Sequence, residues 1–375
     1  MLQDNNHQVF FALLRAGLWE QDVRIVQFGD IDYSEVYRLA EEQSVVGLVA
    51  AGIEHVTGEK VRNEDALVFA GNILQLEQRN QAMDIFIGYI VEKMRKEGIY
   101  TLLLKGQGVA QCYAKPLWRA SGDIDFFLSE DNYRHAKEYL GGIASSVDEE
   151  NAYYRHIAMT ISSWTVELHG TLRGGLWRRL DRALDEVQKS VFYEGNVRSW
   201  IDGHSHVFLP REDEDTVYIF SHILQHFFLE GIGLRQICDW CRLLWTYQNK
   251  LDKTLLKKRL DDMGVMTEWY SFAALVVKYL GMPAVAMPFY DESGRWERKA
   301  DKIMDFVLET GNFGHNRDYS YQNKYPYYIC KIISLGLHIM DFFKYYTIFP
   351  IDSIKVMTRR LTIGIKVVMK GKKHE

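Results

Sequence analysis

The spacing of apolar residues predicts that the chain begins with helices. The expected helices span residues 5–18, 34–54 and 63–96. Asp32 or Ser34 is placed to cap the second helix, and Gly98 to end the third. The residues expected to face inward on the third helix are Leu67, Ile73, Leu74, Ile85, Phe86, Tyr89, Ile90 and Met94. We therefore predict a helical N-terminal unit over residues 1–95.

Short apolar runs replace the helical spacing from about residue 100. The expected strands span residues 100–104, 123–128, 156–162 and 165–169, with a further edge strand at 207–209. The expected helices between them span residues 107–113 and 131–140. A polar pair, Ser162-Ser163, separates the third and fourth strands. This alternation of strands and helices predicts a small mixed-sheet domain over residues 96–210.

Helical spacing returns in the last part of the chain. The expected helices span residues 212–229, 235–247, 253–263, 267–280 and 296–308. We therefore predict an all-helical domain over residues 211–350, followed by a basic tail at 351–375. The predicted fold class is α+β, with a small mixed-sheet core flanked by helices on both sides.

Composition and charge narrow the class of protein. The chain has 375 residues, of which 47% are hydrophobic and 25% charged, and a formal net charge of −5. The slight negative charge argues against a general nucleic-acid binder. The first residues lack the pattern of a signal peptide, and the four cysteines form no disulfide framework. No run reaches the ~18–20 apolar residues that span a bilayer. We expect a cytoplasmic protein without a transmembrane segment.

Two carboxylates, Asp123 and Asp125, stand one residue apart at the start of the second expected strand. Side chains alternate across a strand, so both point to the same face. Like charges this close repel each other unless something cationic lies between them. The neighbours Ile124 and Phe126 mark the strand as otherwise buried. Because oxygen ligands favour Mg²⁺ or Mn²⁺, the pattern predicts a metal-dependent phosphoryl-transfer site.

Three segments carry a shared motif pattern. Residues 103–106 (LLKG) place a glycine after an apolar strand, residues 122–126 (GDIDF) contain the paired aspartates, and residues 166–169 (VELH) hold an isolated carboxylate on a later strand. Together they resemble the nucleotidyltransferase superfamily, which has the DNA-polymerase-β-like fold. They resemble most its bacterial branch of uncharacterised nucleotidyltransferases. The likeness extends to residues 35–53, Tyr113, Arg119, His226, Leu234, Arg235 and Asp239, and so covers about residues 34–244.

The resemblance implies roles for the site residues. Asp123 and Asp125 would bridge two cations, Mg²⁺ or Mn²⁺, and Glu167 would hold the cation nearer the nucleophile. Backbone amides at a helix start suit the phosphates of a nucleoside triphosphate. The nucleotide-binding residues it implies are Lys105, Gly106, Gln107, Gly108, Arg119, Ser121 and Gly122, and the cleft residues are His169, His226 and Arg235.

The reaction that the resemblance implies is nucleotidyl transfer. A nucleoside monophosphate would pass from a nucleoside triphosphate, ATP among the candidates, to an unknown acceptor with release of pyrophosphate. The acceptor would be a small molecule, a protein or RNA. Gln107, however, stands where the superfamily has Gly or Ser, and Gly108 follows one place later. This departure leaves open an alternative, a catalytically inactive protein on the same fold that binds a nucleotide or a partner.

Two further pairs of residues have a spacing that occurs in metal or redox sites. His222 and His226 lie four residues apart on an expected helix, which is a zinc-ligand spacing, but the Glu of the H-E-x-x-H motif is lacking. A place in the wall of the nucleotide or acceptor cleft suits His226 better. Cys238 and Cys241 form a C-x-x-C on an expected helix, whereas a redox motif of this type follows a strand. We expect these cysteines to pack in the core.

The C-terminal segment is aromatic and then basic. After Ile354, seven cationic residues face one acid: Lys355, Arg359, Arg360, Lys366, Lys370, Lys372 and Lys373. Such a segment predicts either weak contact with an anionic membrane surface or a packed helix with a solvated tail. The first alternative would make the protein a peripheral-membrane factor in cell-surface or peptide-product assembly. A toxin-like transferase that acts on tRNA or protein is a further alternative.

Overall fold

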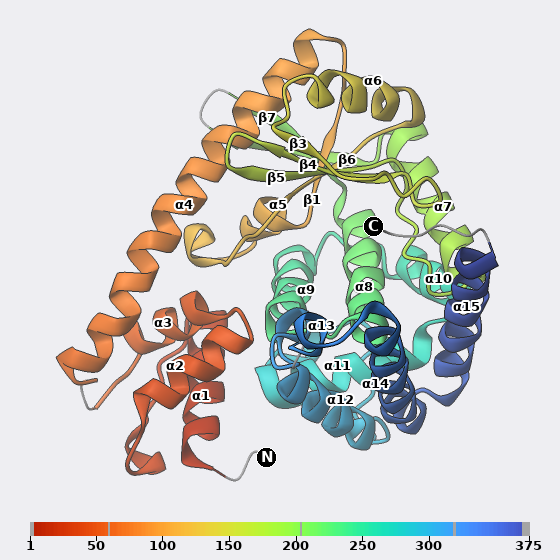
Figure 1. Cartoon of the computed structure of the whole chain (residues 1–375). Coiled ribbons are helices and arrows are strands. Elements are labelled where there is room, and N and C mark those ends of the chain that lie inside the picture. The colour runs from red at the N-terminus through yellow and green to blue at the C-terminus, as the bar shows by residue number, and fades with distance from the viewer. Residues whose placement is uncertain (1–3, 59–60, 203–204, 318–319, 370–375) are drawn as a thin grey trace.

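A seven-stranded mixed sheet lies between two groups of helices in the computed structural model of this chain (Figure 1). The structure describes residues 4–58, 61–202, 205–317 and 320–369. The N-terminal helices and the long helix α4 lie on one side of the molecule, and the C-terminal helices lie below the sheet. The predicted α+β class is confirmed. The domain boundaries near residues 95, 210 and 350 remain predictions.

The strands follow each other across the sheet in the order β3-β4-β5-β2-β1-β7-β6. Strands β2 and β5 are parallel, as are β1 and β7, and the other neighbouring pairs are antiparallel. The strands are β1 Leu102–Leu104, β2 Ile124–Phe127, β3 Ser146–Val147, β4 His156–Ile161, β5 Trp164–His169, β6 Val197–Asp202 and β7 Ser205–Pro210. The four strands expected before residue 170 are therefore present. The first three are shorter than expected by one or two residues, and the fourth begins one residue earlier.

One strand prediction is wrong in its position. The segment 207–209 was expected at an edge, but it belongs to β7, which lies inside the sheet between β1 and β6. The edge on this side is formed by β6 and the opposite edge by β3, neither of which we predicted. The apolar residues Val197 and Ile201 of β6 are 38% and 60% exposed, so β6 lacks the buried apolar face that gives a strand its sequence signal.

Alternation gives the sheet two different faces. Ile124 and Phe126 pack with apolar residues of α4 (Asn63–Lys96) and α6 (Glu130–Gly141), which cover one face. Leu102, Leu104 and Phe127 point the other way, into a core that they share with the C-terminal helices. Polar side chains that alternate with Ile124 and Phe126 therefore face the space between the sheet and the C-terminal helices.

The N-terminal group contains more helices than the sequence suggested. Its helices are α1 Asn5–Trp19, α2 Tyr33–Glu42 and α3 Val46–Glu54, with a short 3₁₀ turn at Val26–Phe28. The single helix expected over 34–54 is wrong, because the chain turns at Ser44, whose φ is 55°. Buried Gln43 explains the break. Its side chain accepts a hydrogen bond from Leu234 N at 3.0 Å and donates one to Val307 O at 3.2 Å.

The long helix α4 has the predicted bounds but not all of the predicted inward face. Ile73, Ile90 and Met94 are buried as expected. Four residues that were expected to be buried are instead 55–71% exposed: Leu67, Leu74, Ile85 and Tyr89. The helix packs on α3 near its start and on the sheet near its end, so it buries different faces along its length. Apolar spacing alone does not show such a change of face.

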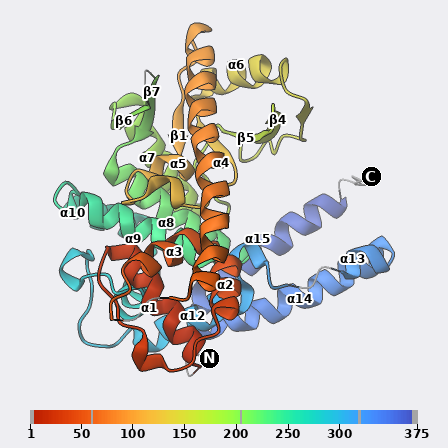
Figure 2. The ribbon, with the colours of Figure 1, turned by 90° about the vertical axis from the view of Figure 1, so that its left-hand side faces the viewer.

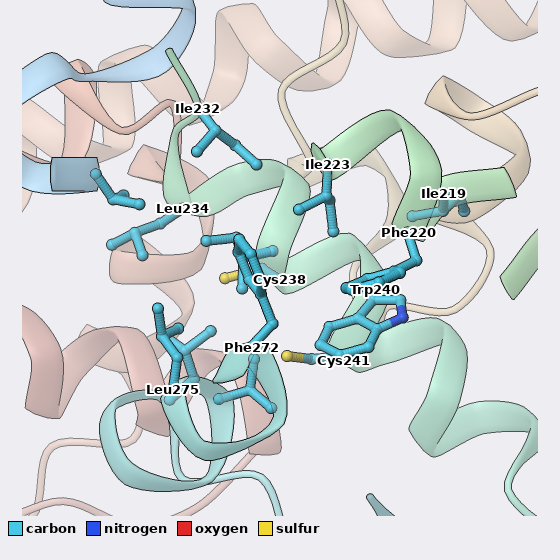
Figure 3. Packing of buried hydrophobic residues seen from close by; sticks show 14 of the residues in the cluster. Ile219, Phe220, Ile223, Ile232, Leu234, Cys238, Trp240, Cys241, Phe272 and Leu275 are labelled. Atoms are coloured by element: carbon cyan, nitrogen blue, oxygen red, sulfur yellow. The ribbon is translucent and has the colours of Figure 1, made fainter. Parts of the chain in front are cut away.

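The helices between and after the strands form the rest of the molecule. They are α5 Gly106–Ala110, α7 Arg178–Tyr193, α8 Glu212–Leu229, α9 Leu234–Tyr247, α10 Lys253–Met263, α11 Met266–Leu280, α12 Glu297–Thr310, α13 Tyr321–Lys324, α14 Tyr327–Ile348 and α15 Pro350–Met369, with 3₁₀ turns at Pro116–Trp118, Ala284–Ala286 and Asn312–Gly314. Trp240 and Phe272 pack beside Cys238 and Cys241 in the core of α8, α9 and α11 (Figure 3). Both cysteines are free and buried, which confirms the packing role.

The basic C-terminal segment forms a helix whose described cations are paired with the protein. Helices α14 and α15 extend together from one side of the molecule (Figure 2). Arg359 lies 2.8 Å from Asp181 on α7, and Arg360 donates to Leu229 O at 2.8 Å. The side chains of Lys366, Lys370, Lys372 and Lys373 lie outside the described residues. Contact with a membrane surface gains no support from these contacts. Among the described helices, none has both the length and the apolar character needed to cross a bilayer.

Two glycines allow α1 and α3 to pack with their backbones in contact. A Cβ at Gly17 would lie 1.9 Å from Leu48 O, and a Cβ at Gly52 would lie 1.9 Å from Leu13 O. We therefore expect Gly17→Ala to force the helices apart and lower the free energy of unfolding by about 1–3 kcal/mol. Urea unfolding, followed by circular dichroism, measures this change.

A matched control is Gly71→Ala in the exposed middle of α4. A Cβ at Gly71 meets nothing within 4 Å. Alanine favours a helix over glycine by about 1 kcal/mol, so this variant should be as stable as the wild type or more stable. Equal stability of Gly17→Ala and the wild type would contradict the close packing of α1 and α3.

Candidate active site

Three carboxylates converge where β2 and β5 run side by side. The register of this parallel pair places Asp125 beside Glu167, and residues paired in this way point to the same face. Asp123 comes directly before β2. One oxygen from each of the three carboxylates lies within 4.8 Å of the other two. The structure thus brings Glu167 to the pair Asp123 and Asp125, from which the sequence separates it by more than forty residues.

Charge compensation for this cluster comes from Lys105, at the end of β1. Its Nζ lies 2.9 Å from Asp125 Oδ1, and the Asp125 side chain is only 2% exposed. Burial alone would lower the pKa of Lys105, but the negative charge of Asp125 and its neighbours outweighs burial and raises it. Lys105 has a φ of 49° and a ψ of −146°, a combination that costs about 1–3 kcal/mol in a non-glycine residue.

Asp123 is the least compensated acid of the three. The negative charge of Asp125, and then burial, raise the pKa of Asp123 above its usual value. The charge of Lys105 acts in the opposite direction but does not cancel them. The raised pKa shows that the carboxylates of Asp123 and Asp125 repel each other by more than Lys105 offsets. Such a cluster attracts a cation.

Two histidines flank Glu167. His169 Nε2 lies 2.8 Å from Asp125 Oδ1 and 3.4 Å from Glu167 Oε2, and His156 Nε2 lies 3.1 Å from the same Glu167 oxygen. Burial acts to raise the pKa of Glu167, but hydrogen bonds from His156 and His169 lower it overall. His169 was expected in the cleft, whereas His156 was not recognised.

The sequence did contain a signal for His156. A hairpin that turns at Ser162-Ser163 pairs residues symmetrically about the turn, which sets His156 opposite His169. Residues paired in this way share one face of the sheet. The sequence predicted both the strand at 156–162 and the polar turn after it. Counting residues along the two strands from that turn places His156 opposite His169.

The nucleotide-binding residues that the resemblance implied fall into two groups. Lys105, Gly106, Arg119 and Gly122 line a cavity of about 360 Å³ beside the carboxylates. Gln107, Gly108 and Ser121 do not line it. Gln107 donates to Asp84 Oδ1 at 2.6 Å and accepts from Ser121 Oγ at 2.6 Å, and Gly108 packs against Leu209. This second group contacts the loop outside the cavity and supports it there.

Arg119 is held by a carboxylate from a distant helix. Its guanidinium donates to both Asp239 oxygens on α9, at 2.8 and 2.6 Å. Tyr113 also donates to Asp239, at 2.8 Å. Both side chains of the ion pair are 7% exposed. A buried bidentate pair of this kind joins the loop before β2 to the C-terminal helices.

Arg235 differs from Arg119 in its partners. It lines the cavity, donates to Ala120 O at 3.0 Å and stacks on Phe313, with its Cζ 5.6 Å from the ring centroid. Within the described part of the chain, no carboxylate lies at ion-pairing distance from it. Burial, and then the positive charge of Arg119, lower the pKa of Arg235 to about 10. Arg235 is therefore a cation on the cavity wall that an anion can neutralise.

The opposite wall comes from α8. His226 lines the cavity as expected, and so does His222, whose Nε2 lies 2.9 Å from His226 Nε2 and 3.4 Å from Lys105 Nζ. Burial, and then the charge of Lys105, hold the pKa of His222 well below its usual value. Among the described residues, neither histidine belongs to a group of three side chains spaced to hold a metal. A zinc site at this pair gains no support.

The donor atoms at the carboxylates fit a divalent cation. Asp123, Asp125 and Glu167 offer oxygen ligands, which is the donor set that Mg²⁺ and Mn²⁺ prefer. The repulsion between Asp123 and Asp125 is the cost that such a cation would remove. The cluster also lies at the wall of the cavity, where a bound substrate can reach it.

Comparison with known families agrees with the resemblance found in the sequence. A family described as an uncharacterised nucleotidyltransferase matches residues 29–281, which include the sheet, the three carboxylates and helices α8 to α11. No curated protein and no solved structure matched the chain. The chain belongs to this family of uncharacterised nucleotidyltransferases.

Proposed function

We propose that the protein is a metal-dependent nucleotidyltransferase that moves a nucleoside monophosphate from a nucleoside triphosphate to an acceptor. The observation that carries this proposal is the convergence of Asp123, Asp125 and Glu167 at the wall of a cavity, in a chain of this family. The acceptor oxygen attacks the α-phosphorus, the bond from that phosphorus to the β-phosphate oxygen breaks, and pyrophosphate leaves. Cytoplasmic placement is part of the proposal.

The three carboxylates would hold Mg²⁺ or Mn²⁺. A bound divalent cation supplies charge neutralisation on the phosphates and on the attacking and leaving oxygens. Glu167 stays ionised at neutral pH because its pKa is lowered, so it can accept a hydrogen bond from the acceptor hydroxyl. Lys105 orients Asp125 through their ion pair, and His169 holds the other side of the same carboxylate.

The phosphates would lie between the loop after β1 and Arg235. Gly106 and Gly122 line the cavity without side chains, which leaves room for phosphate groups close to the backbone. Arg235 supplies positive charge from α9, and no carboxylate of the described residues lies at ion-pairing distance from it. Arg119 was expected to bind the nucleotide directly, but its bidentate pair with Asp239 favours a positioning role. We assign the same supporting role to Gln107 and Ser121.

The geometry of Gln107 bears on the catalytically inactive alternative. Gln107 was the departure that suggested a degenerate site. Its side chain, however, is 2% exposed and bonds with Asp84 and Ser121 rather than facing the cavity. A side chain in this position does not obstruct the phosphates. The departure therefore gives little support to an inactive protein, and transfer activity decides between the two.

The Asp123→Asn variant tests whether transfer activity can be lost without a loss of stability. A carboxyl whose pKa is higher in the folded than in the unfolded chain destabilises the fold above that pKa, so neutralising Asp123 should leave the melting temperature unchanged or raise it. The same change removes a cation ligand and should lower transfer by about 10²-fold or more. The assay follows label from an α-³²P nucleoside triphosphate, in Mg²⁺, to candidate acceptors.

The matched control is Asp148→Asn, which changes an exposed aspartate outside the cavity. This variant should keep wild-type transfer. Wild-type activity in Asp123→Asn would refute the assignment of the carboxylates. Nucleotide binding without any transfer in the wild type would favour the inactive alternative.

Arg235→Met tests the proposed phosphate contact. Loss of a hydrogen bond to a charged group costs about 1.5–3 kcal/mol, so the dissociation constant for nucleoside triphosphate should rise about 10–100-fold. Arg173→Met is the matched control, because Arg173 lines the same cavity but pairs with both oxygens of Asp185, at 2.7 and 2.8 Å. Calorimetry measures both affinities. An unchanged affinity in Arg235→Met would remove Arg235 from the phosphate site.

Arg119→Met should give a different result from Arg235→Met. Its removal leaves the buried Asp239 with the hydroxyl of Tyr113 but without its cationic partner, which costs about 3–5 kcal/mol of folding free energy. We expect a loss of stability in urea unfolding that exceeds the loss in Arg235→Met. Equal stability of these two variants would contradict the positioning role of Arg119.

A further inference from the structure

A second group of potential metal ligands shares Glu167 with the three-carboxylate cluster. It consists of His156, Glu167 and His169, whose ligand atoms all lie within 4.8 Å of one another. Both imidazoles direct Nε2 at the same carboxylate oxygen, Glu167 Oε2, at 3.1 and 3.4 Å. The two rings lie 4.8 Å apart, centroid to centroid. All three side chains line the cavity, so a cation at this position can be reached by solvent and substrate.

These separations fit ligands that share one cation. Metal–ligand bonds of about 2.1 Å place neighbouring ligand atoms about 3.0 Å apart in an octahedron and about 3.4 Å apart in a tetrahedron. The measured Nε2–Oε2 separations of 3.1 and 3.4 Å fall at these values. The two Nε2 atoms lie within 4.8 Å of each other. A cation bound by all three atoms would replace the contacts of both imidazoles with Glu167 and the contact of His169 with Asp125.

The strands fix this arrangement. His156 and His169 are directly opposite each other on the antiparallel pair β4 and β5, and Glu167 lies two residues before His169 on the same face. The His156 side chain is 34% exposed and the His169 side chain is 15% exposed, so neither is buried out of reach. Backbone pairing holds all three ligand-bearing residues in a rigid part of the sheet.

We propose that His156, Glu167 and His169 form a mixed nitrogen and oxygen site that prefers a transition-metal ion such as Mn²⁺ to Mg²⁺. Imidazole nitrogen is a poor ligand for Mg²⁺ and a good one for first-row transition metals, and a two-histidine, one-carboxylate set leaves positions open for substrate. The inference goes beyond the proposed transfer reaction, because it concerns which cation the chain binds with or without a nucleotide.

The test is electron paramagnetic resonance of Mn²⁺ added to the full-length, metal-stripped protein. Nitrogen that ligates Mn²⁺ gives a ¹⁴N hyperfine coupling, which oxygen ligands do not give. We expect this coupling in the wild type, and we expect it to persist in an about hundredfold excess of Mg²⁺. His156→Gln should reduce the coupling and weaken Mn²⁺ binding about tenfold or more, because removing even an outer partner of a metal site costs that much.

Matched variants make the result specific. His206→Gln changes an exposed histidine on β7, outside the cavity, and should bind Mn²⁺ as the wild type does. His169→Gln is the second ligand variant and should also lose the coupling. His156 is the safer first choice because, among the described residues, Glu167 is the one side-chain hydrogen-bond partner of its ring, whereas His169 also holds Asp125. Comparable melting temperatures would exclude misfolding as the cause.

Two outcomes would overturn the inference: Mn²⁺ bound without any ¹⁴N coupling, or ¹⁴N coupling and Mn²⁺ affinity unchanged in both histidine variants. Failure here is distinct from failure of the transfer reaction. Transfer in Mg²⁺ that is lost in Asp123→Asn, together with an oxygen-only Mn²⁺ signal, would retain the proposed function and remove this site. A ¹⁴N coupling to Mn²⁺ in a chain without transfer activity would retain this site and remove the proposed function.

Discussion

The parallel pairing of β2 with β5 is the constraint on which the site depends. This pairing puts Asp125 beside Glu167 on one face, while Ile124 and Phe126 anchor the same strand in the opposite core. A shift of one residue would turn both acids into the apolar core and the apolar residues toward the cavity. The burial of the apolar set therefore stabilises the register that brings the acids together.

Bringing acids together has an electrostatic cost, and the surrounding elements reduce it. Lys105 from the end of β1 and His169 from β5 both contact Asp125. Asp123 remains under-compensated, with a raised pKa. Carboxylates that repel each other and line a cavity could hold a metal ion, as the proposed function requires.

The C-terminal helices complete the cavity that the sheet begins. Helix α8 adds His222 and His226 to its wall, and α9 adds Arg235 and the Asp239 that holds Arg119. The sheet alone would leave the carboxylates on an open surface. The helices that follow the strands supply a second wall, positive charge and the anchor for the loop before β2. The matched family segment accordingly includes these helices as well as the sheet.

The sequence by itself determined the local features of this protein. Helical spacing located the bounds of α4, alternation placed Asp123 and Asp125 on one side of a strand, and the resemblance of residues 166–169 to a family motif selected Glu167 as the third acid. Periodicity shows which side chains share one face of a helix or strand, and the first two of these features follow from that alone. Only the tertiary structure decided which partner each face meets. The buried ion pair of Arg119 depends on Asp239, 120 residues away, and the break at Gln43 depends on partners still further along the chain. Long-range contacts of this kind leave no periodic trace in the sequence, because each depends on two distant segments packing together.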